Sequence, residues 1–224
     1  MVAQLRSAVI WLSQNAASLG GDPERIHVIG HSSGAHLTSV LLTTDWPSLG
    51  APDNILKSGV CVSGMYELRP VMLSARSAYV KLSSEEEDAL SAIRHLDRVR
   101  CPIIVAYGDK ESPELQRQGR EFAAALRARG LASQEMVLAG CNHFEGIRTM
   151  MDRHSPLARA AIAQTSQARL TAEQLYGTWK LLSNTLEDAD GQIRHPLGEH
   201  PKGYLTLTPQ GRFTAILAAE ERKA

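Results

Sequence analysis

The sequence predicts an α/β protein with a mostly parallel sheet, followed by a smaller, antiparallel β segment. Short, continuous apolar runs alternate with helical patterns through the first 160 residues, which is typical of a parallel sheet covered on both faces. A serine lies between two glycines where one apolar run meets a helical pattern. Beyond residue 165 the pattern changes to short strands separated by turn residues, which indicates antiparallel hairpins.

The elements of the first part follow from hydrophobic periodicity and from end signals. Apolar runs predict strands at 26–29, 58–62, 102–107 and 135–138. Helical spacing predicts helices at about 3–18 and 34–43, and another after Asn142. A further helix is expected to begin at Pro113 with Ser112 as its N-cap, and to end at Gly130.

The second part has the composition of β-hairpins. A polar linker joins it to the first part. We expect an α/β domain at 1–164, a linker at 165–172 and a partial β domain at 173–224. The predicted strands lie at 177–184, 203–208 and 212–217, with turns at 188–191 and 209–211. About fifty residues with three or four strands cannot readily close a barrel or bury a full core.

Composition excludes several classes of function. The formal net charge is zero, so we expect no binding to nucleic acid or to a membrane, and no apolar run is long enough to cross a bilayer. Cys61, Cys101 and Cys141 lie forty residues apart without a CxxC motif, which favours buried, reduced thiols over a disulfide or a metal site. With no signal-peptide pattern at the N-terminus, the cysteines favour the cytoplasm. We also expect a small-molecule substrate and a homodimer, and we expect no metal and no cofactor.

Residues 30–34 read GHSSG and fit the G-x-S-x-G motif of a nucleophile elbow. The motif lies between a predicted strand and a predicted helix, which is the context that an elbow requires. The tight turn would expose the Ser32 hydroxyl and aim the backbone N–H of Ser33 at a developing oxyanion. A plain glycine-rich turn is the alternative interpretation. Ser33 is the weaker candidate for nucleophile, because the glycines are centred on Ser32.

A serine nucleophile needs a base, and the base needs an orienting acid. In this fold class the chain order is serine, acid, histidine. Of the eight histidines, His143 lies in the loop after the last predicted strand and is the candidate base. Asp109 and Glu111 both follow the strand at 102–107, and spacing alone does not decide which of them is the acid.

Several separate motifs resemble the arylformamidase (kynurenine formamidase) branch of the α/β-hydrolases over about residues 1–164. They are GHSSGAHL at 30–37, TDW at 44–46, SGMYELRPV at 63–71, SPELQRQ at 112–118 and NHFE at 142–145. The resemblance implies that the acid is Glu111, directly before the Ser-Pro-Glu stretch, with Asp109 as the alternative. It also implies metal-free hydrolysis of N-formyl aryl amides or small aryl esters. Met65 and Tyr66 would line the pocket, with core packing as the alternative role.

One motif of that family is not found here. The family's first oxyanion-hole motif, a His-Gly-Gly-rich loop upstream of the elbow, has no counterpart between Met1 and Gly30. We therefore expect a hydrolase domain that lacks its N-terminal strands and its first oxyanion-hole loop. Loss of one oxyanion donor costs about 10²–10³ in rate. A catalytically inactive fragment is accordingly the main alternative to an active hydrolase.

The C-terminal part resembles the start of a bacterial lipocalin-like domain. The motifs are LYGTWKL at 175–181, followed by Asp-Gly at 190–191, GYL at 203–205 and PQG at 209–211. The resemblance implies a structural role for Trp179, which would close the bottom of the barrel. Binding of a small apolar ligand by this part is a third hypothesis for the function.

Overall fold

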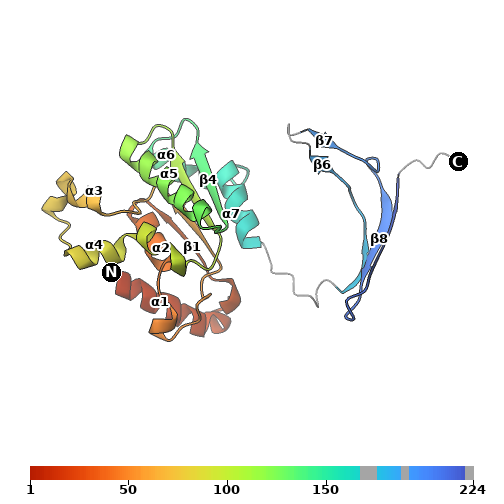
Figure 1. Cartoon of the computed structure of the whole chain (residues 1–224), viewed down its shortest axis with the longest axis horizontal. Coiled ribbons are helices and arrows are strands. Elements are labelled where there is room, and N and C mark those ends of the chain that lie inside the picture. Colours follow the sequence, from red (N-terminus) through yellow and green to blue (C-terminus); the bar gives the residue numbers. More distant parts are fainter. Residues whose placement is uncertain (167–175, 188–191, 220–224) are drawn as a thin grey trace. The chain divides into compact units, whose positions relative to one another are not determined.

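The structure is a computed structural model that describes residues 1–166, 176–187 and 192–219 (Figure 1). It divides into two compact units, Met1–Ser166 and Gln167–Ala224. The predicted turn at 188–191 and residues 167–172 of the predicted linker lie outside the described residues. The predicted fold class is confirmed, since a four-stranded parallel sheet with helices precedes a small antiparallel sheet.

The sheet of the first unit has its four strands in sequence order, all parallel. Both central strands are buried along their whole length, while the edge strands are partly exposed. Helices cover both faces of the two central strands, which explains why these two segments are continuous apolar runs rather than alternating ones. The strands are β1 (His27–His31), β2 (Ser58–Val62), β3 (Ile103–Gly108) and β4 (Ser133–Leu138).

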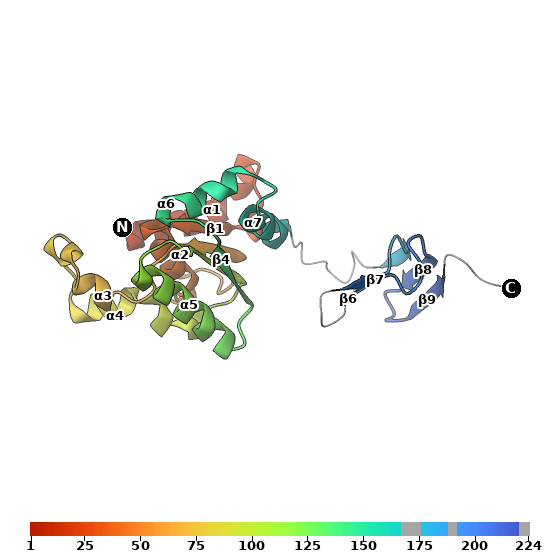
Figure 2. The ribbon, with the colours of Figure 1, turned by 90° about the horizontal axis from the view of Figure 1, so that it is seen from above.

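Two hydrophobic clusters fill the two sides of this sheet. One side carries α2 and α5, with α1 packed beside α2, and the other carries α7 with part of α6. Figure 2 shows α5 and α7 on opposite sides of the strands. The helices are α1 (Val2–Asn15), α2 (Ser33–Leu42), α3 (Arg69–Met72), α4 (Ser84–Leu90), α5 (Pro113–Ala128), α6 (His143–Arg148) and α7 (Pro156–Ser166).

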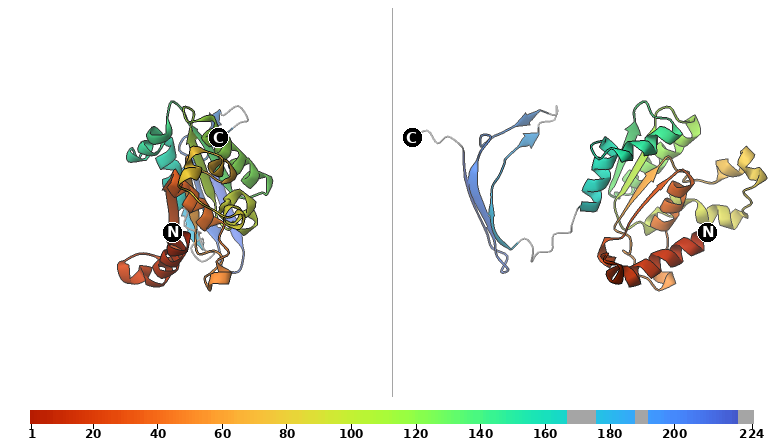
Figure 3. Two further views of the ribbon diagram at one scale, coloured as in Figure 1. Left: turned by 90° about the vertical axis from the view of Figure 1, so that its left-hand side faces the viewer. Right: turned by 180° about the vertical axis from the view of Figure 1, so that it is seen from behind.

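The segment between β2 and β3 contains short helices that the periodicity did not predict. Helix α3 has four residues and α4 has seven, too few turns to show a helical period. Helix α4 has a local end signal instead, since Ser83 and Glu86 make a reciprocal capping box at its start. This segment projects from the sheet at one side of the unit (Figure 3).

Most predicted helix ends are confirmed. The Ser112 side chain accepts a hydrogen bond from the Leu115 N–H at the start of α5, and Gly130 has a φ of +68° just after its end. Helix α7 continues to Ser166 and so includes the first two residues of the predicted linker. Thr165 there accepts a hydrogen bond from Arg25 at its carbonyl oxygen, so the polar composition belongs to an exposed helix end.

The second unit contains a three-stranded antiparallel sheet in the order β5-β8-β9, and a two-stranded ladder of β6 with β7. The predicted strand at 177–184 is shorter in the structure and ends at Lys180, although the Leu181 N–H still donates to the carbonyl oxygen of Gly203 at 2.8 Å. Trp179 lies on β5 and is 46% exposed. The strands are β5 (Gly177–Lys180), β6 (Leu186–Glu187), β7 (Ile193–Arg194), β8 (Lys202–Leu207) and β9 (Phe213–Ala218).

Candidate active site

Ser32 lies at the tight junction between β1 and α2. Its φ of +57° is a conformation that L-residues adopt at a cost, and such strain is frequent at functional sites. The Ser32 N–H donates to the carbonyl oxygen of Val62 at 2.9 Å, which fixes the turn to the neighbouring strand. The geometry is that of a nucleophile elbow at the carboxyl end of a parallel strand.

Only one of the two motif glycines is required by steric crowding. A Cβ on Gly30 would lie 2.1 Å from the carbonyl oxygen of Gly34 and 2.6 Å from the Thr38 hydroxyl. A Cβ on Gly34 would meet no side chain and no other segment within 4 Å. The structure thus gives a steric reason for glycine at position 30 of the G-x-S-x-G motif, but none at Gly34.

The structure brings His143 and Glu111 to Ser32. Nε2 of His143 lies 2.9 Å from the Ser32 hydroxyl oxygen, and Nδ1 lies 3.4 Å from Oε2 of Glu111. A carboxylate only accepts hydrogen bonds, so the contact with Glu111 assigns the proton to Nδ1. The bare Nε2 then faces the hydroxyl, which is the arrangement that a general base needs.

Three donors surround the buried Glu111 carboxylate. Oε1 accepts hydrogen bonds from the Gly108 N–H at 3.0 Å and from the Ser63 hydroxyl, while Oε2 faces His143. A buried carboxylate is costly unless it is paired and hydrogen-bonded, and these contacts compensate it. Sequence reasoning missed Ser63. The available signal was its place at the carboxyl end of β2, next to the strand that carries the acid.

Asp109, the alternative acid, makes a different contact. Its Oδ1 accepts a hydrogen bond at 2.8 Å from the backbone N–H of Gly140, in the loop that leads to His143. The structure therefore places Glu111, and not Asp109, against the imidazole. Asp109 instead links the loop after β3 to the loop after β4.

The loop that carries His143 is held close to β3 by two local features. A Cβ on Gly108 would lie 2.0 Å from the carbonyl oxygen of Cys141, so only glycine allows this approach. Asn142 caps α6 by accepting hydrogen bonds from Phe144 N and Glu145 N. His143 is thereby the first residue of a capped helix, directly beside the carboxyl end of β3.

Ser33 begins α2, and its backbone N–H is one of the first-turn groups that have no partner within a helix. The positive end of the helix dipole adds to the attraction for an anion at this place. The predicted role of the Ser33 backbone as an oxyanion donor is thus compatible with its position beside the Ser32 hydroxyl.

Met65 and Tyr66, the predicted pocket residues, lie in the core of the first unit. Their exposed fractions are 9% and 1%. The Tyr66 ring stacks on Phe122 of α5 with centroids 4.1 Å apart. His36 of α2 contacts the carbonyl oxygen of Met65 through Nδ1 at 3.1 Å, and burial lowers the pKa of this imidazole, an effect that the Met65 contact opposes.

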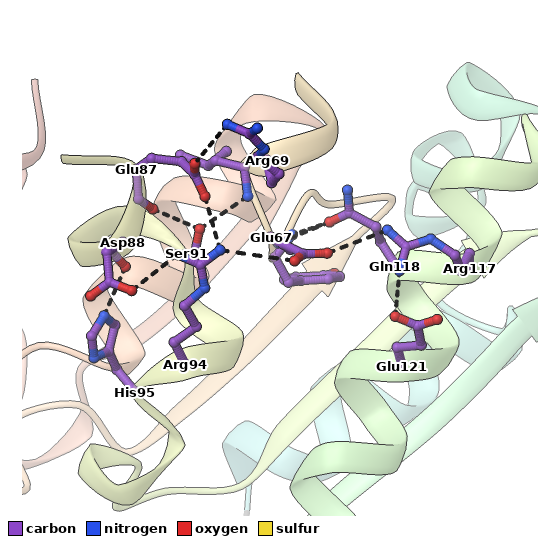
Figure 4. Close-up of polar contacts among 12 residues, drawn as sticks. Glu67, Arg69, Glu87, Asp88, Ser91, Arg94, His95, Arg117, Gln118 and Glu121 are labelled. Atoms are coloured by element: carbon purple, nitrogen blue, oxygen red, sulfur yellow. Dashed lines mark hydrogen bonds and ion pairs between the residues drawn. The ribbon is translucent and has the colours of Figure 1, made fainter. Parts of the chain in front are cut away.

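Buried side chains hold the segment that follows Met65 (Figure 4). Oε1 of Gln118 accepts hydrogen bonds from the N–H groups of Tyr66 and Glu67, and the Ser91 hydroxyl accepts one from Leu68 N. Backbone groups that leave the sheet are thus satisfied by α5 and by the end of α4. Glu67 of the same segment forms ion pairs with Arg117 of α5 and with Arg94, and Arg94 in turn pairs with Glu87 of α4.

Three further properties of the described residues concern metal ligands, membrane spans and cysteines. In residues 1–166, 176–187 and 192–219, no three potential metal-ligating side chains of His, Cys, Asp or Glu converge. No helix in these ranges combines the length and apolar character needed to span a bilayer. All three cysteines are free, and burial raises the pKa of the Cys101 thiol to about 12.

The fold and the site define an α/β-hydrolase. Residues 3–111 match the carboxylesterase family and residues 176–224 match the lipocalin-like domain family. The structure resembles an acetyl ester-xyloside bifunctional hydrolase from Caldicellulosiruptor lactoaceticus with a TM-score of 0.56 at 17% identity. That likeness covers 72% of this chain and 64% of the other, and it supports the fold.

The first unit is similar in sequence to kynurenine formamidases. The protein from Danio rerio is 30% identical over 71% of this chain and 54% of its own length, and that from Salmo salar is 29% identical over 68% and 52%. This chain thus spans about half the length of these two relatives. It is a kynurenine formamidase-like α/β-hydrolase with a lipocalin-like C-terminal part.

Proposed function

We propose that this chain is a serine hydrolase of the arylformamidase or carboxylesterase type. The observation that carries the proposal is the continuous contact from Ser32 through His143 to Glu111. His143 takes the proton from the Ser32 hydroxyl as its oxygen attacks a carbonyl carbon, and later returns the proton to the leaving group. Glu111 holds the imidazole in its Nδ1–H tautomer and stabilises the imidazolium.

The proposed substrate is an N-formyl aryl amide such as N-formylkynurenine, with small aryl esters as alternatives. Similarity to two proteins named kynurenine formamidase supports this choice, as do the motifs around the triad. The Ser33 N–H would stabilise the oxyanion of the tetrahedral intermediate. The cytoplasm as location and a homodimer as oligomeric state stay predictions.

The test is turnover of N-formylkynurenine and of nitrophenyl esters by the purified full chain. We expect Ser32→Ala to abolish turnover. Ser33→Ala should retain measurable turnover, because only the backbone of Ser33 is proposed to take part. Turnover that persists in Ser32→Ala would disprove the nucleophile. A folded parent chain with no Ser32-dependent turnover would instead support the inactive alternative.

A further inference from the structure

His31 directly precedes the nucleophile, and its ring contacts the residue proposed as the base. Nε2 of His31 lies 2.7 Å from the backbone carbonyl oxygen of His143, although 112 residues separate the two. Their ring centroids lie 4.7 Å apart, with the rings tilted by 42°. The His31 side chain thus contacts both the backbone and the ring of His143.

This contact has a defined chemistry. A carbonyl oxygen only accepts hydrogen bonds, so Nε2 of His31 must carry a proton and donate it. The distance of 2.7 Å is at the short end of the ordinary range for an N–H···O bond. The contact between His143 and Glu111 is longer, at 3.4 Å. The orientation of the base therefore depends on more than the acid.

The contact also joins distant parts of the sheet. His31 ends β1, at one edge of the four strands, and His143 follows β4, at the other edge. The Phe144 ring meets the His143 ring edge-on at 5.2 Å but is 71% exposed, so it buries little surface. Among the described residues, the bond from His31 links the first strand directly to the loop of the base.

We propose that His31 is a positioning residue of the site. Its Nε2–H holds the backbone of His143 so that the imidazole stays within reach of the Ser32 hydroxyl. His31 transfers no proton in this scheme and touches no substrate. The inference rests on the proposed hydrolase function, and it names a residue that the triad alone does not include.

Three variants of the full chain test the proposal. His31→Gln keeps an amide donor near the position of Nε2, whereas His31→Leu removes the donor. His95→Leu is the matched control, because His95 Nε2 also contacts a backbone carbonyl oxygen, that of Asp88 at 2.9 Å, away from the triad. A thermal melt of each variant separates a loss of positioning from a loss of folding.

We expect His31→Leu to lower kcat about tenfold with little change in KM, since misplacement by 1 Å can cost about 10²-fold. Labelling of Ser32 by a fluorophosphonate should slow by a similar factor. His31→Gln should recover most of both rates, and His95→Leu should match the parent. Equal rates for His31→Leu and His95→Leu, or no recovery in His31→Gln, would overturn the proposal.

A measurement without turnover distinguishes failure of this inference from failure of the proposed function. Long-range ¹H–¹⁵N spectra of the histidine-labelled parent report the tautomer of each imidazole. We expect the Nε2–H tautomer for His31, and a change in the His143 ring signals in His31→Leu but not in His95→Leu. An Nδ1–H tautomer for His31 overturns the inference even in an active chain. A parent inert to substrate and fluorophosphonate refutes the proposed function instead.

Discussion

The hydroxyl of Ser63 donates a hydrogen bond to Oε1 of Glu111, and both residues are buried. Ser63 has a φ of +57°, and its N–H donates to the carbonyl oxygen of Ala106 at 2.7 Å. A strained residue at the end of β2 thus supplies one of three donors to the acid at the end of β3. Strain at this point is compatible with a role in holding the acid.

Substitution of Ser63 should separate strain from hydrogen bonding. Both Ser63→Ala and Ser63→Gly remove the donor, so we expect each to lower kcat about tenfold and to cost ~1–3 kcal/mol for the unsatisfied carboxylate. Glycine tolerates positive φ, so Ser63→Gly should be about 1 kcal/mol more stable than Ser63→Ala. Urea unfolding and steady-state kinetics measure both effects. A parental kcat in Ser63→Ala would show that the hydroxyl does not support the acid.

The roles of Glu111 and Asp109 are separated by a second pair of variants. Glu111→Gln removes the acceptor charge beside His143 and should lower kcat by about 10³–10⁴, as loss of a triad acid does. Asp109→Ala removes only the acceptor for the Gly140 N–H, so a loss of about tenfold or less is expected. Steady-state turnover of an aryl ester provides the measurement. The assignment of Glu111 is wrong if Asp109→Ala has the larger effect.

The order of the triad could be predicted from the sequence, but the identity of the acid could not be settled from spacing. The G-x-S-x-G motif between a strand and a helix singled out Ser32, and chain order and loop position singled out His143. Asp109 and Glu111 differ only in where their side chains point, which depends on the turn after β3. The carboxylate of Asp109 reaches Gly140, while that of Glu111 turns inward. The family resemblance favoured Glu111, and the structure places that residue at the imidazole.

Several short elements of the structure show no hydrophobic periodicity in the sequence. The four residues of α3 and the seven of α4 are too short for a helical period. The two-residue strands β6 and β7 are too short to alternate visibly. Met65 and Tyr66 follow a strand end, as pocket residues often do, yet Tyr66 stacks on Phe122 of α5, which is distant in the chain.

The two glycines of the elbow provide a matched pair for stability. A Cβ in Gly30→Ala would lie 2.1 Å from the Gly34 carbonyl oxygen, and backbone atoms cannot move aside without disturbing the turn. We expect a loss of ~1–3 kcal/mol in the free energy of unfolding, as for other overpacked sites. Gly34→Ala adds a helix former with free space around it, so its stability should be unchanged or higher. Equal losses in urea unfolding would contradict this account of the elbow.

The buried imidazole of His36 predicts a dependence of stability on pH. Burial lowers its pKa in the folded chain, opposed by the contact with the Met65 carbonyl oxygen. The unfolded chain binds a proton near pH 6.5, whereas the folded chain binds one only at lower pH. His36 therefore does not reduce the free energy of unfolding above about pH 6.5. As the pH falls from there toward the lowered pKa, proton binding to the unfolded chain reduces this free energy by at most ~1.4 kcal/mol per pH unit.

Urea unfolding of the full chain at pH values from 7.5 to 5 measures how its stability depends on pH. His36→Asn removes the titrating group and keeps an amide donor near the position of Nδ1, so its stability should fall less steeply with decreasing pH. The comparison concerns the slopes and not the absolute stabilities. Some slope should persist in the variant, because burial also lowers the pKa of His27, with the nearby Arg25 charge acting in the same direction. Identical slopes in the parent and in His36→Asn would assign the pH dependence to other groups.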